Sequence, residues 1–181
     1  LDHYGTLEAI EETFCKLMAS IPPEGALIVC GENPHVPELA RSTGRTVVTY
    51  GFGAENDVVV RLEEGEPGTN AFSVTLPGGQ AVRVHLDHNP GRHNALNAAA
   101  VLALGVQLGL DAQACAEALS GFAGVHRRFE RVGEVDGRLV IDDYGHHPTE
   151  IAATLSAATR LGRRKVHVVF QPHRYSRTQS L

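Results

Sequence analysis

The sequence predicts an α/β fold, because strand and helix patterns alternate along it. Short apolar runs at 26–30 and 46–50 are typical of buried strands and flank a short helical segment. Residues 92–108 are rich in alanine and carry apolar side chains at helical spacing. With 43% apolar and 20% charged residues, the composition is that of a folded globular protein.

The first fifty residues predict a helix and then two strands around a second helix. An apolar stripe marks the opening helix, which Pro22 and Pro23 end; the stripe consists of Leu7, Ile10, Phe14, Leu17 and Ile21. Asn33 is suited to cap the short helix between the strands, and Pro34 is suited to its first position.

The next segment predicts a small antiparallel patch followed by two helices. Three runs alternate in the manner of strands, at 57–62, 71–76 and 81–86. A turn of Pro77 to Gln80 joins the last two runs. The helix over 92–108 ends at Gly109, and another helix is expected over 112–120.

We expect a domain boundary at Gly121 to Gly124, because this stretch is short and turn-prone. The boundary divides the chain into residues 1–122 and 123–181. Beyond it we predict a right-handed βαβ unit. Its parts are a hairpin around Asp136 and Gly137, with strands at 130–135 and 138–142, a helix from Pro148 through Leu161, and a returning strand at 165–170.

Composition and charge exclude several classes of protein. A net charge of -5 argues against a general nucleic-acid binder, although the basic cluster at 160–165 leaves local phosphate sites open. The chain has three cysteines far apart, which indicates no disulfide framework and fits a reducing cytoplasm. No stretch approaches the roughly 20 apolar residues of a membrane span. A zinc protein built on the ten histidines lacks paired ligand spacing.

The segment 142–148 gathers two carboxylates, a phenol and two imidazoles at the end of a predicted strand. A carboxylate there can accept both hydroxyls of a ribose, and an aromatic ring can lie against a base. The alternative for any single member is local, with Asp142 capping backbone amides and the histidines facing solvent. Taken together, the group favours nucleotide binding.

The segment 171–178 places Arg174 and Arg177 three residues apart, beside His173 and two hydroxyls. Guanidinium groups donate paired hydrogen bonds to phosphates and carboxylates. The alternative is a solvated basic loop. Because ligands of parallel sheets lie beyond the carboxyl ends of strands, we expect this loop and 142–147 to face one crevice.

Two further groups are weaker signals on their own. His93 and Asn97 lie one helical turn apart, so both side chains could reach one edge of a ligand. The alternative is an ordinary helix N-terminus. Arg127 and Arg128 follow the predicted boundary, where an arginine is often only a surface charge.

Four segments in one order resemble the Mur ligase family. They are GRHNALNAAA at 91–100, HRRFE at 126–130, DDYGHHPTE at 142–150 and QPHRYSRT at 171–178. The last two are similar in particular to the member of the family that adds L-alanine. The resemblance covers nearly the whole chain and includes the opening LDHY.

The resemblance implies the end of a truncated P-loop-type central ATPase domain, followed by the start of a Rossmann-like C-terminal domain. We expect the chain to be an interior fragment, because it opens on Leu1 and stops just after the basic loop. We also expect self-association through exposed strand edges.

The resemblance also implies roles for individual residues. His93 and Asn97 would contact adenine, Arg128 the ATP phosphates, and Asp143 and Tyr144 the ribose and base. The side chains that would face the muramoyl carboxylate, its phosphates and the incoming alanine are His146, His173, Arg174 and Arg177. Of all these residues, Arg128 and His146 would be catalytic.

The implied reaction uses ATP and Mg²⁺ to convert the carboxylate of UDP-N-acetylmuramic acid into an acyl phosphate, which the amine of L-alanine then attacks. No GxxxxGK[ST] segment occurs in the chain, and the family's magnesium-binding histidine would precede Leu1. We therefore expect the chain alone to be inactive. Two alternatives remain: another Mur-type ligase, such as the tripeptide-recycling enzyme, and a noncatalytic nucleotide-binding module.

Overall fold

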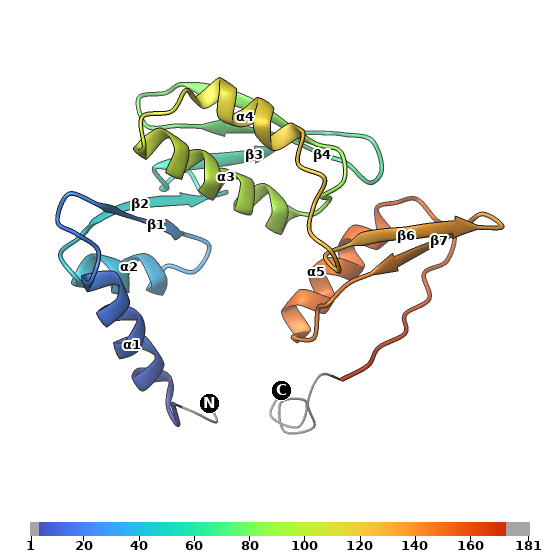
Figure 1. Cartoon of the computed structure of the whole chain (residues 1–181), viewed down its shortest axis with the longest axis horizontal. Coiled ribbons are helices and arrows are strands. Elements are labelled where there is room, and N and C mark those ends of the chain that lie inside the picture. Colours follow the sequence, from blue (N-terminus) through green and yellow to red (C-terminus); the bar gives the residue numbers. More distant parts are fainter. Residues whose placement is uncertain (1–3, 173–181) are drawn as a thin grey trace.

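The computed structural model describes residues 4–172 and shows two modules joined by a linker (Figure 1). The sheet module, residues 4–120, holds a five-stranded sheet with four helices. The hairpin module, residues 127–172, holds two strands and one helix. Its elements are β6 (Glu130–Val135), β7 (Arg138–Asp142) and α5 (Pro148–Thr159).

The sheet module begins with α1 (Leu7–Ala19), β1 (Ala26–Cys30), α2 (His35–Ser42) and β2 (Thr46–Gly51). It continues with β3 (Val58–Leu62), β4 (Asn70–Thr75), β5 (Ala81–Leu86), α3 (Arg92–Gln107) and α4 (Ala112–Ser120). The strands follow the order β1-β2-β3-β4-β5. Strands β1 to β3 run parallel and β3 to β5 antiparallel, so the predicted antiparallel patch is one side of a single mixed sheet.

Side chains and glycines next to the helices define several helix ends. Thr6 caps α1 and Asp111 caps α4, and each side chain accepts a hydrogen bond from the backbone amide of the third helical residue. Helix α2 begins at His35, one residue later than expected, and the Asn33 side chain accepts from the His35 amide at 3.1 Å. Helix α3 ends where Gly109 adopts a φ of +76°, a conformation that favours glycine.

The buried core lies in the sheet module, where α3 packs along β1 to β4 and α4 packs on β5. Its largest fully buried side chains are Val58, Val60, Phe72, Val74, Val84 and Leu102. Figure 1 shows α3 and α4 along one side of the sheet and α2 on the other. The N-terminus of α3 therefore rests on a rigid base and points toward the hairpin module.

The predicted returning strand at 165–170 is wrong. These residues form no strand, and the βαβ unit is incomplete among the described residues, because β7 pairs only with β6. Val169 is 99% exposed, and a cleft of about 1100 Å³ separates this segment from β7 and α5. The β-branched pattern reports the strand propensity of the side chains, whereas a strand also requires a neighbour to accept its backbone hydrogen bonds.

Candidate functional site

A cleft of about 580 Å³ lies between the two modules, and both contribute to its walls. We call it the inter-module cleft. One wall is apolar and includes Val101, Leu119, Phe122 and Val125. The polar side chains in its lining include His93, Asn97, Arg128, Asp143 and Glu150. The mixture suits a ligand with a flat apolar face and polar edges.

Helix α3 supplies His93 and Asn97 from its first two turns, and both side chains line the cleft as their spacing predicted. Gly91 precedes the helix with a φ of +109°. A Cβ atom at Gly91 would lie 2.7 Å from Cε1 of His93, so the imidazole lies directly over this glycine. Glycine is thus required for the backbone conformation and for the position of the His93 ring.

Arg128 sits between two residues with left-handed backbones, Arg127 at φ 58° and Phe129 at φ 51°. Such conformations are uncommon outside glycine and indicate local strain. Hydrogen bonds hold the turn: the Arg128 amide donates to Val125 O at 3.1 Å, and the Tyr144 amide donates to Arg127 O at 2.7 Å. The turn directs Arg128 into the cleft, where its Nη1 lies 3.9 Å from Oε1 of Glu150.

The carboxylate of Asp143 joins this turn to the end of β7. Its Oδ2 accepts from the Phe129 amide at 2.9 Å, and its Oδ1 accepts from the Gly145 amide at 2.7 Å. The capping role that the sequence offered to Asp142 therefore belongs to Asp143. Asp142 instead lies 3.4 Å from Nε of Arg127 in a half-exposed ion pair.

Tyr144 and His146 line the other cleft, the one between β7, α5 and residues 165–172. The guanidinium carbon of Arg127 lies 4.8 Å from the centre of the Tyr144 ring, and the Tyr144 and His146 rings meet edge to face at 5.4 Å. Gln171 and Pro172 reach the same cleft, so the two polar loops do share it up to that point. His173, Arg174 and Arg177 lie outside the described residues.

The predicted site residues are thus divided between two clefts. His93, Asn97 and Arg128 line the inter-module cleft, whereas Tyr144 and His146 line the second cleft. Asp143 lines both.

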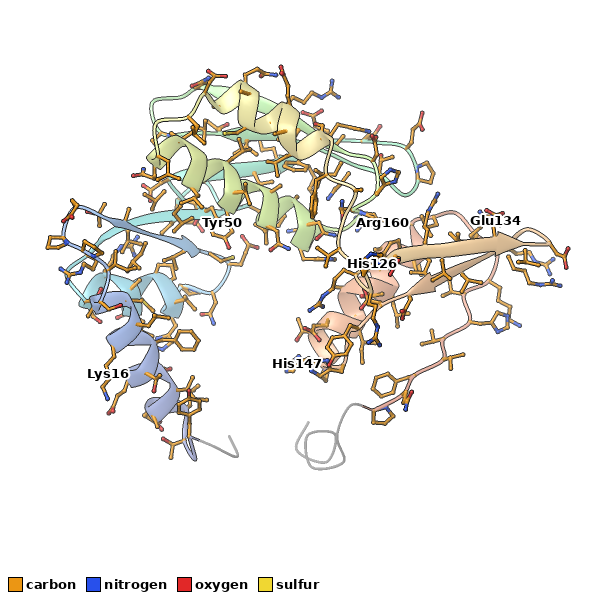
Figure 2. All side chains as sticks on the ribbon, in the orientation of Figure 1. Lys16, Tyr50, His126, Glu134, His147 and Arg160 are labelled. Atoms are coloured by element: carbon orange, nitrogen blue, oxygen red, sulfur yellow. The ribbon has the colours of Figure 1, made fainter. Side chains whose placement is uncertain are left out.

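Glu150 is a site residue that the sequence reasoning missed. It completes a capping box at the start of α5, accepting from the amides of His146 and His147 at 3.1 and 3.2 Å. These two hydrogen bonds lower the pKa of Glu150, and the charges of His146 and Arg128 lower it further. The spacing of His147 and Glu150 is that of a capping box, but histidine is not a preferred N-cap residue, so the signal was weak. Figure 2 shows His147 at this helix start and His126 in the linker.

Burial lowers the pKa of His93, and the charges of Arg128 and Arg160 lower it further, while Asp143 opposes them. All three charged neighbours belong to the hairpin module, and Figure 2 shows Arg160 near the junction of the modules. The neutral imidazole is therefore favoured near neutral pH, with one nitrogen as a donor and the other as an acceptor.

Neither a metal site nor a membrane helix is found in the part of the chain that the structure describes. No three His, Cys, Asp or Glu side chains among residues 4–172 are grouped so that they could hold a metal ion. None of the helices in this range is both long and apolar enough to cross a membrane.

Comparison with known proteins accounts for both modules. Residues 1–105 match the Mur ligase middle domain, and residues 127–180 match the Mur ligase glutamate ligase domain. The chain belongs to the Mur ligase family. Within this family it is 47% identical over its whole length to a UDP-N-acetylmuramate--L-alanine ligase from Nitratidesulfovibrio vulgaris (strain DP4). It covers 40% of that protein, so it spans about two fifths of such a Mur ligase.

Solved Mur ligase structures share the fold. The UDP-N-acetylmuramate-alanine ligase MurC from Thermotoga maritima matches with a TM-score of 0.70 and 31% identity, over 87% of this chain and 34% of that one. The MurF ligase from Thermotoga maritima, solved in complex with ADP, matches with a TM-score of 0.71 over 87% of this chain and 36% of that one. At 22% identity, the second likeness concerns the fold alone.

The lowered pKa of His93 predicts a specific dependence of stability on pH. Because the folded-state pKa lies below the unfolded value of about 6.5, the unfolded chain binds a proton first as the pH falls. The stability that the neutral imidazole contributes is complete above about pH 6.5 and is lost as the pH falls toward the folded-state pKa. Between about pH 7.5 and 5.5, the melting temperature should fall more in the unmodified chain than in His93→Gln. Parallel melting curves for the two proteins would contradict the assignment.

Proposed function

We propose that this chain is part of an ATP-dependent ligase that joins L-alanine to UDP-N-acetylmuramic acid in the cytoplasm, for peptidoglycan precursor synthesis. The observation that carries the proposal is the inter-module cleft, where His93 and Asn97 of α3 face Arg128 and Asp143 of the hairpin module. The whole-length identity to proteins named for this reaction supports the choice of substrates.

In this proposal the cleft binds ATP. The neutral imidazole of His93 and the carboxamide of Asn97 offer donors and acceptors to the edge of adenine, and the apolar wall covers its face. Arg128 binds the phosphates in place of its long contact with Glu150. The ADP bound to the related MurF supports a nucleotide in this fold.

Asp143 and Tyr144 are proposed to bind the ribose and base. Both oxygens of the Asp143 carboxylate already accept backbone amides, yet each carboxylate oxygen can accept more than one hydrogen bond. The side chains proposed to face the muramoyl carboxylate, its phosphates and alanine are His146, His173, Arg174 and Arg177. His146 lies in the second cleft, and Arg127 contributes to the basic character of that cleft.

The chemistry that these residues serve is control of negative charge. A carboxylate oxygen of the sugar attacks the terminal phosphorus of ATP and ADP leaves; the amine of alanine then attacks the carbonyl carbon of the acyl phosphate and phosphate leaves. Arg128 would stabilise charge on the transferred phosphoryl group, and His146 charge near the reacting carboxylate. In this proposal, the ligands of magnesium and a P-loop lysine would be supplied by the rest of the Mur ligase, since the chain spans about two fifths of such a protein.

We also propose that the boundary between the central and C-terminal domains lies at Gly121 to Gly124, which gives residues 1–122 and 123–181. The two family matches leave residues 106–126 between them, which is compatible with this position. Gly124 has a φ of +97°, so the linker bends where few residues other than glycine fit.

The two alternative functions differ from this proposal, one in the group that is joined to the sugar and the other in the absence of catalysis. A tripeptide-recycling ligase would share the general plan, but the relatives named for L-alanine and the 31% identity to MurC favour alanine. A noncatalytic nucleotide-binding module would bind ATP without turnover, and it shares with our expectation for this chain alone only the absence of catalysis.

An assay of phosphate release separates these functions. The full-length parent should release phosphate from ATP only when UDP-N-acetylmuramate and L-alanine are both present, and the 181-residue chain should release none. Turnover with a tripeptide instead of L-alanine would favour the recycling ligase. Turnover by the chain alone that survives repurification, and that a change of Arg128 abolishes, would contradict the expected inactivity.

Arg128 in the full-length parent should affect turnover more than binding. A contact made chiefly in the closed, reacting state lowers kcat and kcat/KM together, and its loss should cost roughly 3 kcal/mol, about a hundredfold. Arg128→Lys should resemble Arg128→Ala, because lysine keeps the charge but loses the planar fork.

Steady-state kinetics of both variants tests this prediction, and thermal melting of each variant excludes misfolding as the cause of a loss. If Arg128 is only a solvated charge beside Glu150, both variants should keep kcat within about twofold of the unmodified enzyme. That result would remove Arg128 from the proposed site.

A further inference from the structure

Two buried asparagines connect the sheet module to the linker. Asn70 begins β4 and is 8% exposed, and Asn89 lies in the loop between β5 and α3 and is 7% exposed. A buried carboxamide is almost always hydrogen-bonded, because a buried polar group without a partner is costly. The partners of Asn70 and Asn89 therefore indicate which backbone segments these side chains hold in place.

Asn70 fixes the loop that leads into α3. Its Nδ2 donates to Gly91 O at 2.8 Å and to Asn89 O at 3.4 Å. Gly91 immediately precedes α3 and lies under the ring of His93. The position of His93 therefore depends on a loop that is held from within the core of the sheet module.

Asn89 extends the same network to the linker. Its Nδ2 donates to Phe122 O at 3.1 Å. A Cβ atom at Gly124 would lie 2.9 Å from Oδ1 of Asn89, so the linker backbone passes closely over this side chain. Asn89 thus lies against the linker at Phe122 and again at Gly124.

The far end of the linker is held by the hairpin module. The Arg128 amide donates to Val125 O, and the Tyr144 amide donates to Arg127 O. Only a few residues separate this turn from Phe122, so the direction in which the chain leaves Phe122 sets where Arg128 faces His93.

We propose that Asn89 is a positioning residue that orients the hairpin module against α3, so that Arg128 and Asp143 face His93 and Asn97. The inference rests on the proposed function of the inter-module cleft. Asn89 itself lines that cleft, and its side chain acts through the linker backbone. If it served only to satisfy polar groups of its own loop, its loss would weaken the fold without changing the relation between the modules.

Residual dipolar couplings in the 181-residue chain distinguish the two roles, because they report the orientation of each module separately. One alignment tensor should fit both modules of the unmodified chain. In Asn89→Ala, the alignment magnitude of the hairpin module should fall at least twofold relative to the sheet module. Equal magnitudes in the variant would overturn the proposal.

Asn56→Ala is the matched control. Asn56 is an equally buried asparagine, 8% exposed, in the loop between β2 and β3, and its Nδ2 donates to the backbone oxygen of Gly53 at 2.9 Å rather than to the linker. It should lower the melting temperature and leave a single alignment tensor. Loss of the common tensor in this control as well would show a general loosening and overturn the proposal.

Asn89→Asp provides the second variant in case alanine prevents folding. It keeps the shape of the side chain but replaces the donor that faces Phe122 O, so it should also uncouple the modules. These couplings are measured without nucleotide. Addition of ADP to the unmodified chain then tests the cleft separately, since a failure to bind would count against the proposed function and leave the orientation result standing.

Discussion

The turn at Arg127 to Phe129, held by the carboxylate of Asp143, is the feature on which the candidate site depends. Two non-glycine residues with left-handed backbones cost on the order of 1–3 kcal/mol each. The Asp143 carboxylate offsets this cost through the Phe129 amide, and Oε2 of Glu130 accepts from the Arg127 amide at 2.7 Å. The strained backbone and the hydrogen bonds that offset its cost together fix the position of Arg128, the only arginine among the described residues that line the inter-module cleft.

The cleft itself is made of two parts that are complete only when they meet. The sheet module supplies a rigid base, the edge groups of His93 and Asn97, and much of the apolar wall. The hairpin module supplies charge, and its own core is small, with Phe129 and Ala157 its buried apolar residues in the described range. Because the second module is weakly packed alone, its orientation depends on the linker and on Asn89. The geometry therefore links the proposed nucleotide binding to the relative position of the modules.

Features determined by neighbouring residues were predictable from the sequence. The hairpin at Asp136 and Gly137 formed as expected, with φ values of 50° and 72°, because this turn depends on two residues alone. His93 and Asn97 share the cleft because helical spacing places them on one face. The strand at 165–170 failed because its formation depends on a partner strand, which a local pattern does not report.

Local sequence patterns also could not predict that the candidate site residues would be divided between two clefts. Asp143 and Tyr144 are adjacent in the sequence, yet the backbone at the end of β7 turns the Tyr144 ring toward the Arg127 guanidinium and keeps the Asp143 carboxylate on the amide of Phe129. The choice between Asp142 and Asp143 as the capping carboxylate was likewise decided by which one faces Phe129. These outcomes depend on contacts between residues more than ten positions apart.

Amide hydrogen exchange at Phe129 tests the central claim most directly. In Asp143→Ala the Phe129 and Gly145 amides should exchange roughly tenfold faster or more than in the unmodified chain, because each loses a hydrogen bond to a charged acceptor. Asp142→Ala, which removes only an ion pair at the neighbouring position, should leave both rates nearly unchanged. Unchanged exchange at Phe129 in Asp143→Ala, or equal acceleration in the two variants, would contradict the account.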